Sequence, residues 1–306
     1  MSSILQYLVR NMLALTIAPS PDKKALYIVE EDEGSLIQSL ITDGKPGIRE
    51  EIAEEVKQGT PALYLVVDGK DEEERLVLYL DESDELCCSR YNSESYEWEE
   101  GEFEGISSPL VVHPGTRLSG FSNLNETKVI YQNPALELEI MSMRNGSWTT
   151  GGKIPVEAQA GAPHVTMDSP DQIHVFYLRK DNQIGHAMQQ YKTGVWKDTV
   201  LQNSLFDTQV SHFLVIPVDT QGSFDVYAAA GDKLVRIEAN GKRQELGRIN
   251  KSKLIPLTNE ECAPYVPWAL GFASFLIGFS FGSQHLRRPG VGQQPEAPVP
   301  LVGGAF

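Results

Sequence analysis

Cysteine is scarce in this chain of 306 residues, which contains only three. Small secreted proteins that depend on disulfides carry many more, so a disulfide framework is excluded. Cys87 and Cys88 are adjacent and would point to opposite faces of a strand, which makes them poor partners for each other. The first 18 residues also lack a basic start followed by an uninterrupted apolar core, the pattern of a secretory signal. We therefore predict a cytoplasmic protein with reduced thiols.

Basic residues are also few, because 26 Lys and Arg face 42 Asp and Glu, for a net charge of −16. Residues 30–104 carry 24 of the acidic residues and only 6 basic ones. This balance argues against nucleic-acid binding, which needs basic patches to neutralise phosphates. The acidic runs 30–33 and 71–74 lack the spaced ligands and turn glycine of a calcium loop, so we interpret them as solvated hairpin tips.

Motifs for nucleotide binding or nucleophilic catalysis are missing as well. The sequence contains no Walker loop, no GxGxxG and no GxSxG. Its six histidines show no zinc-ligand spacing. We therefore expect neither a cofactor nor a metal.

A repeat with a period near 50 residues is the strongest positive signal. An apolar residue followed by tyrosine recurs five times, and the tyrosines are 52, 52, 46 and 50 residues apart. These anchor tyrosines are Tyr27, Tyr79, Tyr131, Tyr177 and Tyr227. Each copy is predicted to contain four short strands, which is typical of an all-β fold of the β-propeller type.

The predicted strands are clearest in the second, third and fourth copies. In the fourth they are 164–167, 173–178, 184–189 and 195–200, separated by turn residues. In the third they are 117–122, 128–132, 138–143 and a strand at Trp148 that follows the hairpin dipeptide Asn145-Gly146. In the second they are 62–67, 75–80, 86–91 and 96–103. Helical periodicity is scarce, and 48–57 is the one stretch that favours a turn of helix.

The expected sixth copy falls in an uncharged apolar segment, residues 263–283. One interpretation is a sixth four-stranded blade completed by an N-terminal strand at 4–9, which would close the ring and protect its edges. The alternative is five blades plus a C-terminal apolar helix that contacts a membrane. The position in the repeat favours six blades, so residues 1–285 are predicted to form one propeller and residues 286–306 a flexible Pro/Gly-rich tail.

Two copies resemble the blades of a known family. The residues are Lys180 to His186 followed by Trp196, and Lys128 to Gln132 leading to Asn145-Gly-Ser-Trp148. Over roughly residues 13–250 the chain is similar to the fungal fucose-specific lectins. The resemblance implies a six-bladed propeller with sugar pockets between neighbouring blades. In each family pocket an arginine on the second strand and a glutamate on the third bind the sugar hydroxyls, and a tryptophan stacks on the sugar.

The polar part of that sugar clamp does not carry over. Three residues before the anchor tyrosines, where the family has arginine, are Lys24, Leu76, Lys128, His174 and Phe224. Nine residues after them, where the family has glutamate, are Leu36, Cys88, Ile140, His186 and Arg236. Arg75 is one position away from the first set, and a short shift would bring Gln38 into the second. Tryptophan remains near its expected place as Trp98, Trp148 and Trp196. Without its charged pair a buried pocket would hold a polyol poorly, and Leu76 with Cys88 would form an apolar groove.

This departure favours a hydrophobic small molecule as the ligand. Some lectin-like propellers of fungal natural-product biosynthesis are pericyclases, and the resemblance implies such a role here. The activity would be a cofactor-free hetero-Diels–Alder coupling of a quinone methide with a terpene, driven by proximity and a hydrogen-bond donor. We predict His174 and His186, which should be near each other, as the catalytic donors. The predicted substrate contacts are Lys128, Trp148, Tyr177, Trp196, Cys88, Arg75 and Trp98.

Two rival hypotheses come from other functional classes. The first is a fucose-binding or degenerate lectin, which would depend on the tryptophans. The second is a protein-interaction propeller that uses the acidic 30–104 face and loses its partner at high salt.

Overall fold

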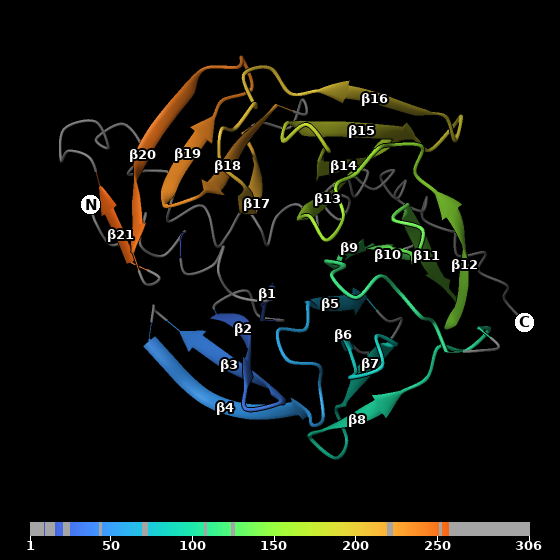
Figure 1. Cartoon of the computed structure of the whole chain (residues 1–306). Helices are drawn as coiled ribbons and strands as arrows, with labels where there is room; N and C mark the ends of the chain where they lie inside the picture. Colours follow the sequence, from blue (N-terminus) through green and yellow to red (C-terminus); the bar gives the residue numbers. More distant parts are fainter. Residues whose placement is uncertain are drawn as a thin grey trace, which may run out of the picture.

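Five antiparallel sheets are arranged around a common centre in the computed structural model (Figure 1). The structure describes residues 9, 16–20, 25–42, 45–68, 73–106, 109–123, 126–218, 223–250 and 253–256. These residues contain 21 strands, and each sheet is built from strands that are consecutive in the sequence. The predicted all-β propeller is therefore confirmed for five blades.

Each blade begins near the centre of the ring and ends at its rim (Figure 1). Blade 1 consists of β1 (Thr16–Pro19), β2 (Ala25–Asp32), β3 (Ser35–Thr42) and β4 (Lys45–Ala53). Blade 2 consists of β5 (Ala62–Asp68), β6 (Glu73–Leu80), β7 (Leu86–Asn92) and β8 (Glu97–Gly101). Blade 3 consists of β9 (Ser119–Ser122), β10 (Thr127–Gln132), β11 (Leu138–Arg144) and β12 (Ser147–Lys153). Blade 4 consists of β13 (His164–Ser169), β14 (Gln172–Leu178), β15 (Ile184–Gln190) and β16 (Trp196–Val200). Blade 5 consists of β17 (Val210–Pro217), β18 (Phe224–Ala230), β19 (Lys233–Ile237), β20 (Arg243–Asn250) and β21 (Lys253–Pro256).

The innermost strands join the blades to one another. Strand β5 contacts β1 and β9, and β13 contacts β9 and β17. Because successive side chains of a strand point to opposite faces, each central strand buries residues against both neighbouring blades. In β6, Leu76 and Leu78 pack toward blade 3, whereas Val77 and Tyr79 pack toward blade 1. The functional question therefore concerns the four junctions between blades, named here 1/2, 2/3, 3/4 and 4/5.

Two expectations concern segments at the chain ends. Three predicted segments lie outside the described residues, so the sixth blade stays a prediction. They are the apolar segment 263–283, the tail 286–306 and the strand 4–9 except for Val9. Val9 is buried against Ala229 and Leu234 of blade 5. Among the residues that the structure describes, no helix is long and apolar enough to span a membrane.

The predicted turn of helix at 48–57 is wrong. Residues Lys45–Ala53 form the outer strand of blade 1 and pair with β3. Ile48 and Ile52 have a spacing that suits one face of a helix, but Ile48 is exposed and only Ile52 is buried. The open edge of β3 supplies backbone hydrogen-bond partners, which outweighs the weak local preference.

A glycine in blade 4 provides a test of the packing between adjacent strands. Gly185 pairs with Tyr177, and a Cβ atom at Gly185 would lie 2.3 Å from Cζ of the tyrosine ring. The ring is fully buried, and its hydroxyl donates to the Asp198 carboxylate at 2.9 Å. We expect Gly185→Ala to lower the free energy of unfolding by about 1–3 kcal/mol because the ring must move. Urea titration measures this loss.

The matched control is Gly152→Ala. A Cβ atom there would lie 3.4 Å from Cβ of Ile140, an ordinary contact, and we expect a change within about 0.5 kcal/mol. Equal losses for the two variants would show that the contact with Tyr177 is not the cause.

Candidate functional site between the blades

Three tryptophans occupy equivalent places in blades 2, 3 and 4. Each tryptophan lies on the fourth strand of its blade and pairs with a residue of the third strand. In all three blades that third-strand residue comes four positions after the one that pairs with the anchor tyrosine. Each packs toward the preceding blade, so junctions 1/2, 2/3 and 3/4 receive one indole each. These residues are Trp98, Trp148 and Trp196. The predicted equivalence of the tryptophans is confirmed, but their surroundings differ.

Junction 2/3 is part of the hydrophobic core. Trp148 is only 2% exposed and packs in one cluster with Leu76 and Cys88, which are also buried. Burial raises the pKa of the Cys88 thiol to about 12, so the thiol is inert. The predicted apolar groove is wrong, and Trp148 and Cys88 are core residues rather than ligand contacts, because the apolar side chains of the two blades fill the space between them.

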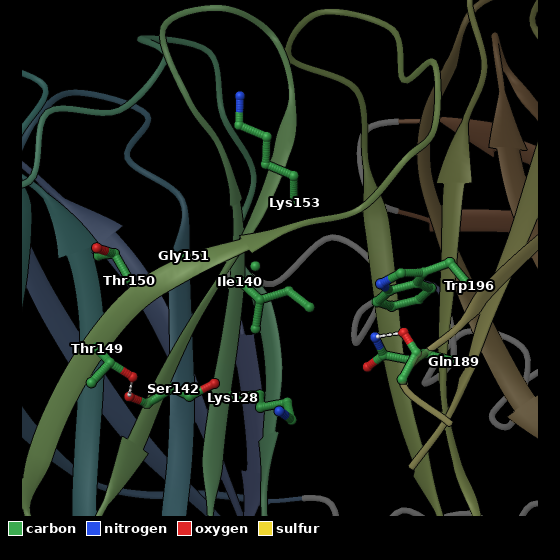
Figure 2. Close-up of a pocket in the computed structure, with 11 residues that line it drawn as sticks. Lys128, Ile140, Ser142, Thr149, Thr150, Gly151, Lys153, Gln189 and Trp196 are labelled. Atoms are coloured by element: carbon green, nitrogen blue, oxygen red, sulfur yellow. Dashed lines mark hydrogen bonds between the residues drawn. The ribbon is translucent and has the colours of Figure 1, made fainter. Parts of the chain in front are cut away.

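Junction 3/4 contains a pocket of about 440 Å³. Blade 3 contributes Lys128, Ile140 and Ser142, and blade 4 contributes Gln189 and Trp196 (Figure 2). Thr149, Thr150 and Lys153 of β12 complete the polar part of the lining. Two residues that the sequence predicts as ligand contacts, Lys128 and Trp196, therefore lie on opposite walls of one pocket.

The Lys128 ammonium forms an ion pair with a carboxylate. It lies 3.0 Å from Glu126, which also accepts a hydrogen bond from Arg144 Nε at 2.9 Å. Burial works to raise the pKa of Glu126, but the hydrogen bonds from Arg144 and Lys128 outweigh it and hold the pKa below its usual range. Glu126 is thus ionised and fixes the position of the lysine, whose remaining donors can face a ligand.

Junction 4/5 contains the predicted histidine pair. Nδ1 of His174 lies 2.9 Å from Nε2 of His186, so the predicted proximity is confirmed. The His186 ring stacks on Phe176 at 4.2 Å and meets the edge of Phe224. Both histidines are buried, and burial lowers the pKa of each, that of His186 to about 3. The pair is a neutral polar contact within the core and does not present the accessible donor that the catalytic prediction requires.

Tyr177, another predicted substrate contact, is also a core residue. Its ring is fully buried and its hydroxyl donates to Asp198. Burial raises the pKa of the phenol, and the hydrogen bond to the Asp198 carboxylate raises it further, so the phenol stays protonated. Its role is to pack blade 4 against blade 3.

The positions counted from the anchor tyrosines are wrong in blades 1 and 5. In blade 4 the counted residue His186 directly follows the partner of Tyr177, but Arg236 is itself the partner of Tyr227. In blade 1, Leu36 lies four residues before the partner of Tyr27. The anchor tyrosines of blades 2, 3 and 4 face the preceding blade, whereas Tyr27 and Tyr227 lie on the opposite face of their blades. Counting from Tyr27 or Tyr227 therefore gives residues on the wrong face. Lys24 lies outside the described residues.

Junction 1/2 brings together Arg75 and Trp98, the last two predicted contacts. The guanidinium carbon of Arg75 lies 3.2 Å from the ring centroid of Tyr91 and 5.7 Å from that of Trp98. Tyr64 of β5 and Tyr27 of β2 stack on each other at 5.4 Å in the same junction. The three tyrosines do not stand out as a group in the sequence. Arg75, Val77 and Tyr79 alternate along β6 and therefore share one face of the strand, which indicates that Arg75 faces junction 1/2.

The comparisons support the fold. No protein-family model matches the sequence, and no curated protein matches it. The solved structure of AofleA from Arthrobotrys oligospora superposes with a TM-score of 0.61 at 18% identity, covering 78% of this chain and 72% of that one. The six-bladed lectin of Aleuria aurantia gives 0.59 at 16% identity over 76% and 77%. The BP39L lectin of Burkholderia pseudomallei gives 0.56 at 18% over 75% and 68%. At these identities the likeness shows a lectin-like β-propeller fold.

Proposed function

We propose that this protein is a carbohydrate-binding propeller whose main site is the pocket in junction 3/4. The observation that carries the proposal is the pairing of the Trp196 indole on one wall with polar groups on the other. An indole stacks on the apolar face of a sugar ring, while an ammonium, hydroxyls and an amide bind its hydroxyls. The volume of about 440 Å³ suits a small ligand.

The preferred sugar is not expected to be fucose. The Aleuria aurantia lectin is described as having a fucose recognition mode. The resemblance to the fucose-specific lectins implies a clamp of one arginine and one glutamate. Here Lys128 and Ile140 occupy those positions. A lysine offers a point charge instead of a planar fork, and isoleucine offers no acceptor, so the pocket must select a different arrangement of hydroxyls.

The cofactor-free cycloaddition stays a prediction. The two histidines on which it relied are buried against Phe176 and Phe224, and the junction 3/4 pocket is lined mainly by polar side chains. No feature of the pocket favours a terpene over a sugar. A terpene or tropolone-type ligand is therefore included in the test as the competing outcome.

The test is a binding screen with a matched pair of variants. Thermal stability is measured with a panel of monosaccharides that includes fucose and, separately, with the apolar ligands. A ligand at about 100 times its Kd should stabilise the protein by about 2.7 kcal/mol. We expect Trp196→Ala to weaken binding of the selected sugar at least about tenfold, because the stacking platform is lost.

The control variant is Val195→Ala. Val195 is exposed, lies next to the tryptophan and does not line the pocket, so its loss should leave the affinity unchanged. Sugar binding that survives Trp196→Ala would contradict the assignment of the site. Stabilisation by the apolar ligands alone would contradict the carbohydrate proposal and restore the cycloaddition hypothesis.

A further inference from the structure

Polar side chains join the innermost strands of blades 3 and 4. His164, Thr166 and Asp168 alternate along β13 and therefore share the face that meets blade 3, where each forms a hydrogen bond. Junctions 2/3 and 4/5 differ, because leucines of β5 fill the equivalent place in the first, and Phe213 and Val215 of β17 fill it in the second. Strands β9 and β13 lie side by side near the common centre of the sheets (Figure 1). Hydrogen bonds thus replace much of the apolar packing at the inner edge of junction 3/4.

His164 is the central residue of these contacts. Its Nε2 lies 2.9 Å from the Arg117 carbonyl oxygen, which can only accept, so Nε2 carries the proton of the neutral ring. Its Nδ1 lies 2.7 Å from the Ser119 hydroxyl, and that hydroxyl lies 2.7 Å from the hydroxyl of Thr166. The neutral imidazole accepts from Ser119 on one side and donates to Arg117 on the other. One side chain of blade 4 therefore joins two residues at the start of blade 3.

A protonated His164 would lie among groups that do not offset its charge. Burial lowers the pKa of the imidazole to about 4, the hydrogen bond to the Arg117 carbonyl offsets part of this, and the Arg117 guanidinium lowers the pKa further. Its cross-strand partner Tyr177 is an uncharged phenol, and burial keeps His212 of β17, which the same guanidinium influences, neutral. Asp168 acts in the opposite sense, because burial raises the pKa of its carboxyl and its protonation favours the closed junction. An exposed histidine titrates near 6.5, well above a carboxyl, so acid first favours the open junction.

A chain of hydrogen bonds connects these contacts to the wall of the pocket that carries Lys128. Asp168 accepts from the Asn123 amide at 3.0 Å and from the Tyr191 hydroxyl. The Asn123 side-chain oxygen accepts from the backbone N–H of Glu126 at 3.1 Å, and the Glu126 carboxylate lies 3.0 Å from the Lys128 ammonium. A separation of β9 from β13 would therefore move an ammonium group that lines the pocket.

We propose that these contacts form a proton-sensitive latch on the junction 3/4 pocket. When His164 takes up a proton, the latch opens, Lys128 moves away from the wall that carries Trp196, and the pocket releases its ligand. The release step rests on the proposed function, whereas the opening of the latch does not. The latch comprises Ser119, Asn123, His164, Thr166 and Asp168.

Amide hydrogen exchange of the full chain without ligand, corrected for the intrinsic effect of pH on exchange, measures the opening. His164 titrates near 4 in the closed latch and near 6.5 when exposed, so the closed state is fully favoured above pH 6.5 and loses this advantage as the pH falls. We expect the exchange of β9 and β13 to accelerate about 30-fold from pH 7.5 to pH 5, while that of β6 in blade 2 changes less than about threefold. His164→Gln keeps an N–H donor without titrating and should abolish the acceleration. The matched control His113→Gln alters a half-buried histidine outside the latch and should retain it.

A second variant tests the role of charge. Arg117→Met keeps the backbone carbonyl but removes the like charge beside His164, so the acceleration should be smaller than in the wild type. Equal acceleration in blade 2 would indicate global unfolding and would overturn the proposal. Acceleration confined to β14, β15 and β17 would also overturn it, because the proton would then act at the His174–His186 pair. The same holds for acceleration that persists in His164→Gln.

Binding of the monosaccharide panel at pH 7.5 and pH 5 tests the release step. The affinity for the bound sugar should fall at least about threefold at pH 5 in the wild type, because the binding-competent fraction decreases, and should stay unchanged in His164→Gln. Constant affinity in a latch that opens would overturn the release step. If no sugar binds at either pH, the proposed function fails, and the exchange data alone decide whether the latch exists.

Discussion

Replacing Trp148 with alanine is expected to lower the free energy of unfolding by about 3–5 kcal/mol, the usual range for a buried tryptophan. The side chain is 2% exposed and meets the edge of Phe103 at a centroid distance of 5.5 Å. It also packs against leucines of blade 2 in the cluster of junction 2/3. Its removal leaves a cavity that these side chains can fill only in part. Urea titration with an unchanged m-value would measure the loss.

The equivalent residue Trp196 provides the control. It is half-buried at the wall of the junction 3/4 pocket, so Trp196→Ala should cost less than about 1.5 kcal/mol in stability. The two variants should then separate stability from ligand binding at one structural position. Similar losses of stability for both would contradict the distinction between a closed and an open junction.

The contrast between these two tryptophans explains how one fold can hold sites of different character. The described blades place one indole at each of three junctions, and the neighbouring side chains decide whether the indole is buried in the core or lines a pocket. Leucines pack against Trp148 and fill junction 2/3, whereas Ser142 and Gln189 line an open pocket beside Trp196. The scaffold therefore does not determine the function, which depends on the local residues.

Much of the fold could be predicted from the sequence because blades 2 to 4 have regular strands and strong turns. The strands predicted at 62–67 and 138–143 differ from β5 and β11 by one residue at one end. The alternation of buried side chains and dipeptides such as Asn145-Gly146 determine these boundaries locally. The equivalent positions in blades 1 and 5 were harder to predict because Tyr27 and Tyr227 lie on the opposite face of their blades from the other anchor tyrosines. A shift of one residue exchanges the two faces of a strand.

The candidate site could be predicted only in part. Lys128 and Trp196 line one pocket, and the family resemblance supplied both positions within the repeat. Whether Trp148 or Cys88 is accessible depends on side chains of the next blade, which a pattern within one blade does not reveal. The arginine cluster of junction 1/2 combines residues from β2, β5, β6, β7 and β8, so its assembly depends on tertiary packing.

Stability is expected to fall steeply as the pH decreases from 7 to 4.5. Burial lowers the pKa of His164 to about 4 and that of His186 to about 3, whereas a histidine in the unfolded chain titrates near 6.5. His164 is fixed in its neutral form between the Ser119 hydroxyl, 2.7 Å from Nδ1, and the Arg117 carbonyl oxygen, 2.9 Å from Nε2. The unfolded chain therefore binds more protons than the folded protein below pH 6.5.

The sign and size of the effect follow from this difference in bound protons. The stabilisation is fully present above pH 6.5 and is lost as the pH falls toward the folded pKa values of about 4 and about 3. One proton at His164 and one at the His174–His186 pair give a loss on the order of 4 kcal/mol between pH 7 and pH 4.5. Glu126, whose pKa is lowered, adds to the loss only at more acidic pH. Urea midpoints measured in half-unit steps of pH give the slope directly.

The double variant His174→Phe with His186→Phe tests whether the pair belongs to the core or to a binding site. Replacing both partners leaves no unpaired nitrogen, and the new rings can stack where His186 now lies between Phe176 and Phe224. About half of the acid sensitivity should disappear, while sugar binding at junction 3/4 should be retained. An unchanged slope would show that the pair is not buried and neutral. A reduced slope accompanied by loss of ligand binding would return the histidines to the functional site, because a purely structural pair should affect stability alone.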